Sequence, residues 1–317
     1  MRADTTLRRL GLSRPARCHR LDAVRRSASR GFTLFELILV IVIGGLIAAV
    51  LTVFLRPAFD SYLAVRTRSA IAAQADVALH RIVRDVRSSV PNSIRSPNDQ
   101  CFELVPTLTG GRLRMAADTV NDSAPGCSPG ASCAAPLDTS QLTSSVDVLT
   151  LLSATPAPGD WLVIGNQSPG EVYSGSNRAV INAVSTPDAR YGRQRLSIAP
   201  TQFPLGYDGG RFSIVSASQQ AVFYVCSGAD GTLDAAGNGR GTLQRLSGYG
   251  FNSSYPASCP SAGSGQLLAT KVRRCSFVFD PNQGATQQNG FVYLQIELSR
   301  NGESAALAVG AHISNVP

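Results

Sequence analysis

The 317-residue sequence holds few of the side chains that perform catalysis or bind metals. It has three histidines, and only His80 and His312 lie beyond the amino-terminal leader. No cysteines have Cys-x-x-Cys spacing, and the Gly-x-x-x-x-Gly-Lys and His-Glu-x-x-His motifs are missing. Asp230 and Asp234 lie in a turn-rich loop without the spacing of a calcium loop, so we interpret them as part of a hairpin turn. We therefore predict no enzymatic activity, no metal site and no cofactor.

Outside its first 31 residues the chain has almost no net charge. Residues 1–31 contain nine arginines and two aspartates, a net charge of +7, whereas the remaining 286 residues contain 20 basic and 19 acidic side chains. A nucleic-acid-binding surface would need basic residues clustered on the folded part, so we expect no nucleic-acid partner. Arginines in front of an apolar helix instead keep that end in the cytoplasm and place the rest of the chain across the membrane.

Charged residues are also missing from a long apolar segment behind the leader. Phe32–Leu55 spans 24 residues and contains one ionisable side chain, that of Glu36. As a helix it would be about 36 Å long, enough to cross a hydrocarbon core of about 30 Å. It is too long for the apolar core of a cleaved secretory signal, and no small-residue cleavage pattern follows it. We therefore predict a transmembrane helix over residues 32–55.

The stretch Arg30-Gly-Phe-Thr-Leu-Phe-Glu36 resembles the prepilin peptidase site of type IV pilins and of type II secretion pseudopilins. The resemblance implies cleavage after Gly31, N-methylation of the new amino-terminal Phe32, and Glu36 as the fifth residue of the mature chain. Glycine suits the cut because it extends easily into a protease site. The leader is longer than this function needs, and a start near Val24 would leave a short one.

Two interpretations of Glu36 follow from its position near one end of the apolar segment. A carboxylate at the centre of a membrane helix costs about 2.5–3.5 kcal/mol, and less near the end. In one interpretation, the positive terminal amine of Phe32 in a neighbouring subunit neutralises Glu36 and sets the register of a helical bundle. In the other, Glu36 reaches the lipid headgroups. The resemblance favours the first.

Helical character extends past the apolar segment, with Gly44, Gly45 and Pro57 as points where the helix is expected to kink or melt locally. Residues 58–90 contain no glycine or proline, and Pro91 ends the helix. One apolar stripe with helical spacing runs along its second half: Leu79, Ile82, Val83, Val86 and Val90. Arg81, Arg84, Asp85 and Arg87 are expected to lie largely off that stripe.

After about residue 100, short β-branched and aromatic runs alternate with turn residues, a pattern typical of antiparallel strands. We predict an α+β fold, in which a long amino-terminal helix, transmembrane in its first half and amphipathic in its second, packs on an antiparallel sheet. The predicted domains are a basic leader over 1–31, a transmembrane helix over 32–55, an amphipathic helix over 56–91 and a periplasmic β-rich domain over 92–317. Residues 116–145 and 165–178 are expected to be long loops.

Six cysteines follow the membrane segment, an even number that suits disulfides in an oxidising compartment. They are Cys101, Cys127, Cys133, Cys226, Cys259 and Cys275. The spacing permits many pairings, among which we favour Cys127 with Cys133 and Cys226 with Cys275. Free buried thiols are the alternative.

A narrower resemblance covers about a third of the chain. Asp76–Asp85, Cys101–Pro106, Val222–Cys226 and Asn301–Ser304 look similar to the MshO group of minor pilin-like proteins, which serve the mannose-sensitive haemagglutinin (MSHA) pilus. The resemblance implies a structural subunit that prepilin peptidase cleaves and methylates. It is anchored once in the bacterial inner membrane, amino terminus in the cytoplasm and carboxy-terminal domain in the periplasm, and reaches the cell surface on assembly.

The same resemblance implies a set of partners. They are the major pilin, other minor pilins, prepilin peptidase, the inner-membrane assembly platform and membrane lipid, and no small-molecule substrate is expected. The alternatives are a minor pseudopilin of type II secretion and a tip adhesin or DNA-uptake pilin.

Overall fold

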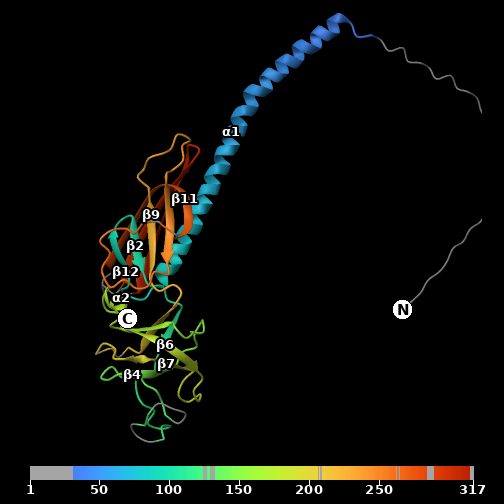
Figure 1. Cartoon of the computed structure of the whole chain (residues 1–317). Helices are drawn as coiled ribbons and strands as arrows, with labels where there is room; N and C mark the ends of the chain where they lie inside the picture. The colour runs from blue at the N-terminus through green and yellow to red at the C-terminus, as the bar shows by residue number, and fades with distance from the viewer. Residues whose placement is uncertain are drawn as a thin grey trace, which may run out of the picture. The chain divides into compact units, whose positions relative to one another are not determined.

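The computed structural model describes residues 31–314, except 124–126, 129–132, 206, 208, 262, 264 and 284–288. The chain divides into two compact units, Met1–Phe59 and Asp60–Pro317, each of which is described by itself. The described residues form one long helix, one helix of four residues and thirteen strands. The predicted α+β fold, a long amino-terminal helix followed by antiparallel sheets, is confirmed (Figure 1).

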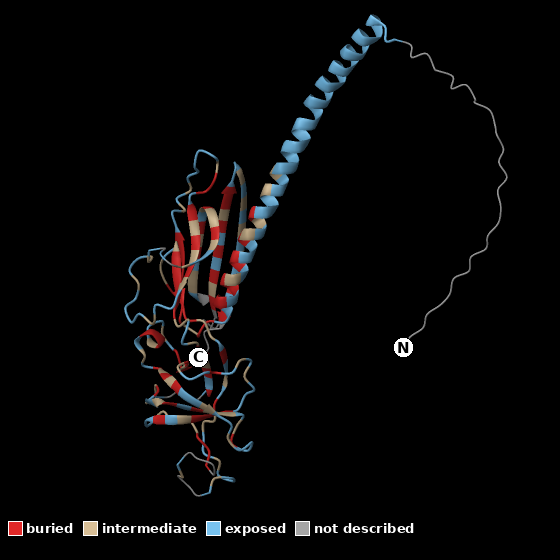
Figure 2. Ribbon diagram, turned by 45° about the vertical axis from the view of Figure 1, so that its right-hand side comes forward, coloured by how far each residue is buried: buried red, intermediate tan, exposed pale blue. Residues whose placement is uncertain are grey.

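The long helix α1 runs from Leu34 to Arg87. It continues without a break through Gly44, Gly45 and Pro57, so local melting at these positions is not observed. The part of α1 in the first unit, up to Phe59, is exposed along its whole length (Figure 2).

The part of α1 in the second unit is buried on one side only. The predicted apolar stripe is confirmed for the four of its residues that lie in α1, all of which are buried, and Ile71, Ala75 and Ala78 extend it toward the amino terminus. The helix ends at Arg87 and not at Pro91, because the Val90 N–H donates to the Val105 carbonyl oxygen at 2.8 Å, and Val90 is buried beyond the helix. Asp85 is an exception to the sequence pattern. The spacing predicts that it lies off the stripe, but its side chain is only 8% exposed.

The stripe packs on a seven-stranded antiparallel sheet. Its strand order is β1-β2-β9-β10-β11-β12-β13. The helix and one face of this sheet share a single apolar core, which includes Phe102, Tyr224 and Phe277. Figure 1 shows the carboxy-terminal part of α1 running alongside this sheet. The bounds of the strands are β1 Arg95–Asn98, β2 Cys101–Leu104, β9 Val222–Ser227, β10 Gly241–Ser247, β11 Gln266–Gln283, β12 Asn289–Arg300 and β13 Glu303–Ser314.

A second antiparallel sheet of six strands is inserted between β2 and β9. Its order is β3-β8-β5-β6-β7-β4, and it has its own apolar core around Leu162, Ile164 and Ile214. The predicted loop at 165–178 contains the short helix α2, Glu171–Ser174, and the first residue of β6. The strands are β3 Thr109–Arg112, β4 Thr143–Val148, β5 Trp161–Ile164, β6 Arg178–Ser185, β7 Gln194–Thr201 and β8 Arg211–Val215.

A third cluster of buried residues joins the two sheets close to the end of α1. Its members come from both sides of the junction: Val90, Val105, Val163, Val172, Tyr173, Val215 and Ala221. Polar contacts tie the same region together. The Tyr173 hydroxyl donates to the Ser93 carbonyl oxygen at 2.9 Å, and the Asn166 side chain donates to the Pro91 carbonyl oxygen at 2.6 Å. The inserted sheet is therefore anchored to the chain that leaves the helix.

Candidate assembly segment

The helix begins immediately behind the predicted cleavage point. Gly31, Phe32 and Thr33 precede the first helical residue, and the Thr33 hydroxyl accepts a hydrogen bond from the Glu36 backbone N–H at 3.2 Å. A threonine that caps a helix in this way satisfies one of its free donors, and a glutamate three residues later completes the capping-box spacing. Glu36 therefore lies in the first turn, where the helix dipole favours a negative charge. Sequence reasoning missed the part played by Thr33.

Gly31 occupies open space. A Cβ atom built at this position would meet no atom within 4 Å, and Phe32 is 76% exposed. Packing within the chain therefore does not require glycine at position 31. A requirement for glycine there, and for an aromatic residue after it, has to come from another molecule.

The apolar segment that follows presents large side chains on every side. Among its residues, Leu34, Phe35, Val53 and Phe54 are each at least 70% exposed. Large exposed apolar surfaces on this scale mark contact with a membrane or with other proteins. In the part of the chain that the structure describes, α1 is the one helix long and apolar enough to cross a membrane. The segment can thus be covered by lipid or by the same segment of neighbouring molecules.

Within the second unit, buried charged side chains hold α1 on the seven-stranded sheet. The sequence did not reveal these contacts. The Asp85 carboxylate accepts hydrogen bonds from the Tyr224 hydroxyl at 2.7 Å and from Arg245 Nε at 2.9 Å. Burial and the nearby Asp85 carboxylate raise the pKa of Tyr224. At the edge of the same unit, Arg68 on the helix pairs with Glu303 of β13. In the sequence, Asp85 resembles any other polar residue of an amphipathic helix. Its buried position becomes evident only from its partners on β9 and β10.

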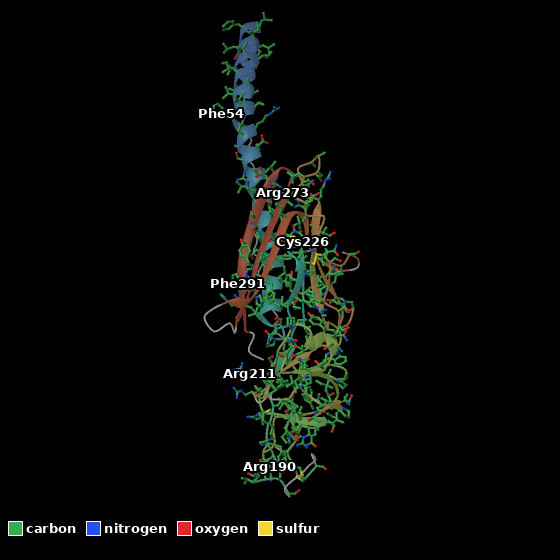
Figure 3. All side chains as sticks on the ribbon, turned by 90° about the vertical axis from the view of Figure 1, so that its left-hand side faces the viewer. Phe54, Arg190, Arg211, Cys226, Arg273 and Phe291 are labelled. Atoms are coloured by element: carbon green, nitrogen blue, oxygen red, sulfur yellow. A yellow bond between two sulfur atoms is a disulfide. The ribbon has the colours of Figure 1, made fainter. Side chains whose placement is uncertain are left out.

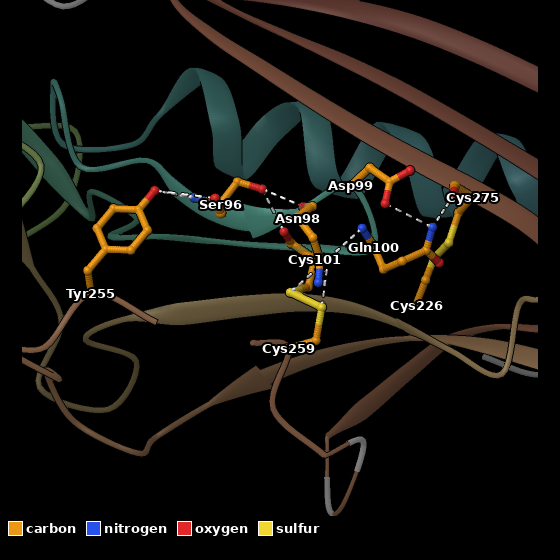
Figure 4. The surroundings of a disulfide bond; sticks show 9 residues. All are labelled: Ser96, Asn98, Asp99, Gln100, Cys101, Cys226, Tyr255, Cys259 and Cys275. Carbon is orange, nitrogen blue, oxygen red and sulfur yellow. Dashed lines mark hydrogen bonds between the residues drawn. A yellow bond between two sulfur atoms is a disulfide. The ribbon is translucent and has the colours of Figure 1, made fainter. Parts of the chain in front are cut away.

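The six cysteines behind the membrane segment form three disulfides in the structure. Cys127 is bonded to Cys133 and Cys226 to Cys275, the two pairings that we favoured, and Cys101 is bonded to Cys259. The last bond fastens the loop before β11 to the start of β2, 158 residues away in sequence (Figure 4). Beside it, the Tyr255 hydroxyl accepts a hydrogen bond from the Ser96 backbone N–H at 3.0 Å.

The other residues singled out in the sequence are not brought together into a reactive site. His80 and His312 are exposed on α1 and β13. The Asp234 carboxylate accepts hydrogen bonds from the backbone and side chain of Asn238, which lower its pKa, and Thr232 does the same for Asp230. Both aspartates thus stabilise their own turn. Within the described residues, no group of three or more histidine, cysteine or acidic side chains is placed to hold a metal ion.

Comparison with known proteins gives one match. Residues 26–52 match the family model described as the prokaryotic N-terminal methylation motif. The match includes Gly31, Phe32 and Glu36 and about the first third of α1. No curated protein and no solved structure is detectably similar to the chain. The chain therefore carries a prepilin signal of the type IV pilin kind, and proteins with this signal are structural subunits of pili or pseudopili.

Proposed function

We propose that this protein is a minor pilin-like subunit of a type IV pilus of the MSHA kind. Prepilin peptidase cleaves it after Gly31 and methylates Phe32. The mature chain is held in the inner membrane by residues 32–55, with the second unit in the periplasm. It then joins the filament, or primes its assembly, together with the major pilin and other minor pilins. It has no enzymatic activity.

One observation carries the proposal. The matched motif ends in a helix whose apolar side chains are exposed all round, and Glu36 is the sole ionisable group in that segment. Such a surface is stable in lipid, and it is also hidden from water when identical helices bundle. A subunit that moves from membrane to filament needs both environments for the same residues.

The Glu36 carboxylate favours transfer of the subunit from the membrane into the filament and sets its axial position there. Cleavage after Gly31 exposes an amine at Phe32, which is positively charged at neutral pH and keeps that charge after methylation. In a bundle, the amine of one subunit lies within reach of the Glu36 carboxylate of another only at defined axial offsets. Because opposite charges attract strongly where water is excluded, that offset is favoured over others.

The decisive experiment removes the charge of Glu36 and keeps the helix start. Glu36→Gln retains the capping-box spacing with Thr33, because glutamine serves at this position as well as glutamate. We expect the variant to be cleaved before Phe32 and inserted in the membrane, but to fall at least about tenfold in purified filaments, a loss of about 1.4 kcal/mol or more. Intact-mass analysis of the mature protein gives the cleavage site and quantitative mass spectrometry gives the incorporation.

The matched control is Thr52→Val. Thr52 lies in the same apolar segment, and its hydroxyl donates to the Ala48 carbonyl oxygen of its own helix at 2.7 Å. The substitution removes a polar group of similar size without changing charge, so incorporation should match the parent. Equal incorporation of Glu36→Gln and the parent would contradict the proposed register mechanism, and a mature chain that begins upstream of Phe32 would contradict the proposed processing.

Two further measurements separate this function from its nearest alternatives. Deletion of the gene should abolish surface pili and leave protein secretion intact; the opposite result identifies a type II pseudopilin. The number of copies per filament should be far below that of the major pilin, because an inserted second sheet gives this subunit a large outer domain. A copy number close to that of the major pilin would show it to be a shaft subunit instead.

A further inference from the structure

The inserted sheet carries a pocket where it meets the chain leaving α1. The pocket has a volume of about 430 Å³. Val90 and Pro91 line one side, and strands β3, β5 and β8 supply Arg112, Val163 and Arg211. Small-molecule sites in proteins have volumes of roughly 300–1,000 Å³ and are mostly apolar with a few converging polar groups. The pocket meets this description.

Strand register brings the two arginines to the same face of the sheet. Arg112 of β3 and Arg211 of β8 are direct partners in the antiparallel pairing of these strands. Directly opposite residues in such a pair project from the same side of the sheet, and their Cβ atoms are about 5 Å apart. Ser213, two residues after Arg211, shares that side and also lines the pocket. Figure 3 labels Arg211.

Like charges directly opposite each other destabilise a sheet, so this pair calls for an explanation. Both arginine side chains are exposed. In the described parts of the chain, neither guanidinium group has an ion pair or hydrogen bond, and no acidic residue lines the pocket. By contrast, Arg195 in the same sheet is paired with Asp147 at 2.6 Å. The two positive charges at the pocket are thus available to an outside group.

We propose that this pocket binds a small amphipathic anion, with its carboxylate or phosphate group held by Arg112 and Arg211 and its apolar part against Val90, Pro91 and Val163. The planar guanidinium group matches the geometry of carboxylate and phosphate oxygens, and two of them share the charge of one oxyanion. The Thr150 hydroxyl accepts a hydrogen bond from the Arg112 backbone N–H at 2.9 Å, so its own hydrogen is free to point at the ligand. This site goes beyond a structural role in a filament.

The test measures binding by the full-length protein in lipid nanodiscs with isothermal titration calorimetry. Two aromatic anions serve as probes: phenyl phosphate carries a phosphate group and phenylacetate carries a carboxylate. Two further compounds are controls, because 2-phenylethanol lacks the charge and inorganic phosphate lacks the apolar part. We expect saturable binding of at least one aromatic anion at one site per chain. The neutral alcohol should not bind, and inorganic phosphate should bind at least about tenfold more weakly. The heat that arises when the aromatic anions partition into the nanodisc lipid is measured separately. It is given by the same titration of the Arg112→Gln, Arg211→Gln double variant.

Single substitutions locate the site. Arg112→Gln and Arg211→Gln should each weaken binding roughly tenfold to a hundredfold, the usual effect of losing a charged hydrogen bond. Arg300→Gln is the matched control, because Arg300 is exposed at the end of β12 in the other sheet and its loss changes the net charge equally. Thermal unfolding should show all three variants at least as stable as the parent, since these side chains are exposed and the two pocket variants also relieve a like-charge pair.

Three results would overturn the proposal. One is the lack of saturable binding of either aromatic anion to the parent protein. Another is an equal affinity of the parent and both pocket variants. The third is inorganic phosphate binding as tightly as the aromatic anions, which would leave the apolar wall without a role. None of these outcomes depends on filament assembly, so they are separate from the Glu36 experiment.

Discussion

Asp85 of α1 and Arg245 of β10 form an ion pair inside the second unit, with 2.9 Å between Asp85 Oδ2 and Arg245 Nε. The Asp85 and Arg245 side chains are only 8% and 4% exposed. Arg245 also donates to the Gln219 side chain at 2.7 Å, and Tyr224 donates to Asp85. Apolar burial along the stripe is non-directional, whereas this set of hydrogen bonds has the geometry of one position of the helix on the sheet.

We expect Asp85→Asn to destabilise the second unit by about 3–5 kcal/mol, because it leaves Arg245 buried without its counter-charge. Urea unfolding, followed by the emission of Trp161, measures the free energy change. Asp76→Asn is the control, since Asp76 lies on the same helix with its side chain 56% exposed and should change the free energy by less than about 0.5 kcal/mol. Similar losses in both variants would contradict the assigned role of Asp85.

The buried tyrosines predict a loss of stability at high pH. Burial raises the pKa of Tyr224 and of Tyr173 above the ordinary value of 10.0, so the unfolded chain releases these protons first. Their contribution is therefore complete below about pH 10 and is lost as the pH rises further. Urea unfolding at pH 8 and pH 10.5 should show a lower free energy of unfolding at pH 10.5.

Tyr224→Phe isolates one of the two tyrosines. The substitution removes a proton that the folded state retains. The difference in the free energy of unfolding between pH 8 and pH 10.5 should therefore be smaller in this variant than in the parent. The parent protein at both pH values is the reference. A pH dependence that is unchanged by Tyr224→Phe would show that Tyr224 does not supply it.

The disulfides are expected to differ in their effect on stability. In the chain-entropy account, a crosslink stabilises more when it closes a longer loop. The bond between Cys101 and Cys259 spans 158 residues, and the bond between Cys127 and Cys133 spans 6. Replacing the first pair with alanine should therefore cost about 3 kcal/mol more than replacing the second. Thermal unfolding of the two double variants tests this order, and peptide mapping without reduction verifies the connectivity.

Asn166 is expected to hold the junction between the two sheets. It is 2% exposed, and its side-chain oxygen accepts hydrogen bonds from the Val172 N–H at 3.0 Å and from Asn177 at 2.9 Å. Asn166→Ala leaves these donors and the Pro91 carbonyl oxygen without partners, at about 1–3 kcal/mol for each unsatisfied group. Gln167→Ala, at the exposed neighbouring position, is the control. Chemical denaturation compares them, and equal stabilities would refute the assignment.

Much of the fold was predictable from local patterns. The second half of the helix and its buried stripe follow from spacing, because a period of 3.6 residues with no glycine or proline fits no other element. Strands β5 and β8 fit the pattern from which strands were predicted after residue 100, since each is a short apolar or alternating run between turn residues. The assembly segment was equally visible, because its signal is an excess of apolar residues around one acidic side chain.

The remaining features depend on contacts between distant residues. Asp85 is buried because Tyr224 and Arg245 supply hydrogen bonds to its carboxylate. These two residues are 139 and 160 positions away in sequence. The division into two sheets was missed because β2 and β9 pair across the whole insertion, and no local pattern specifies that pairing. The pocket arginines were missed for the same reason, since Arg112 and Arg211 become neighbours only through strand register.

The insertion leaves and rejoins the first sheet at adjacent points. Leu104 at the end of β2 and Val222 at the start of β9 are cross-strand partners, so the entrance and the exit of the inserted segment are side by side. A segment attached in this way can be exchanged like a cassette without redirecting the strands on either side. Grafting the corresponding stretch from another such subunit between these two residues is therefore a practical route to chimaeric subunits with new outer surfaces.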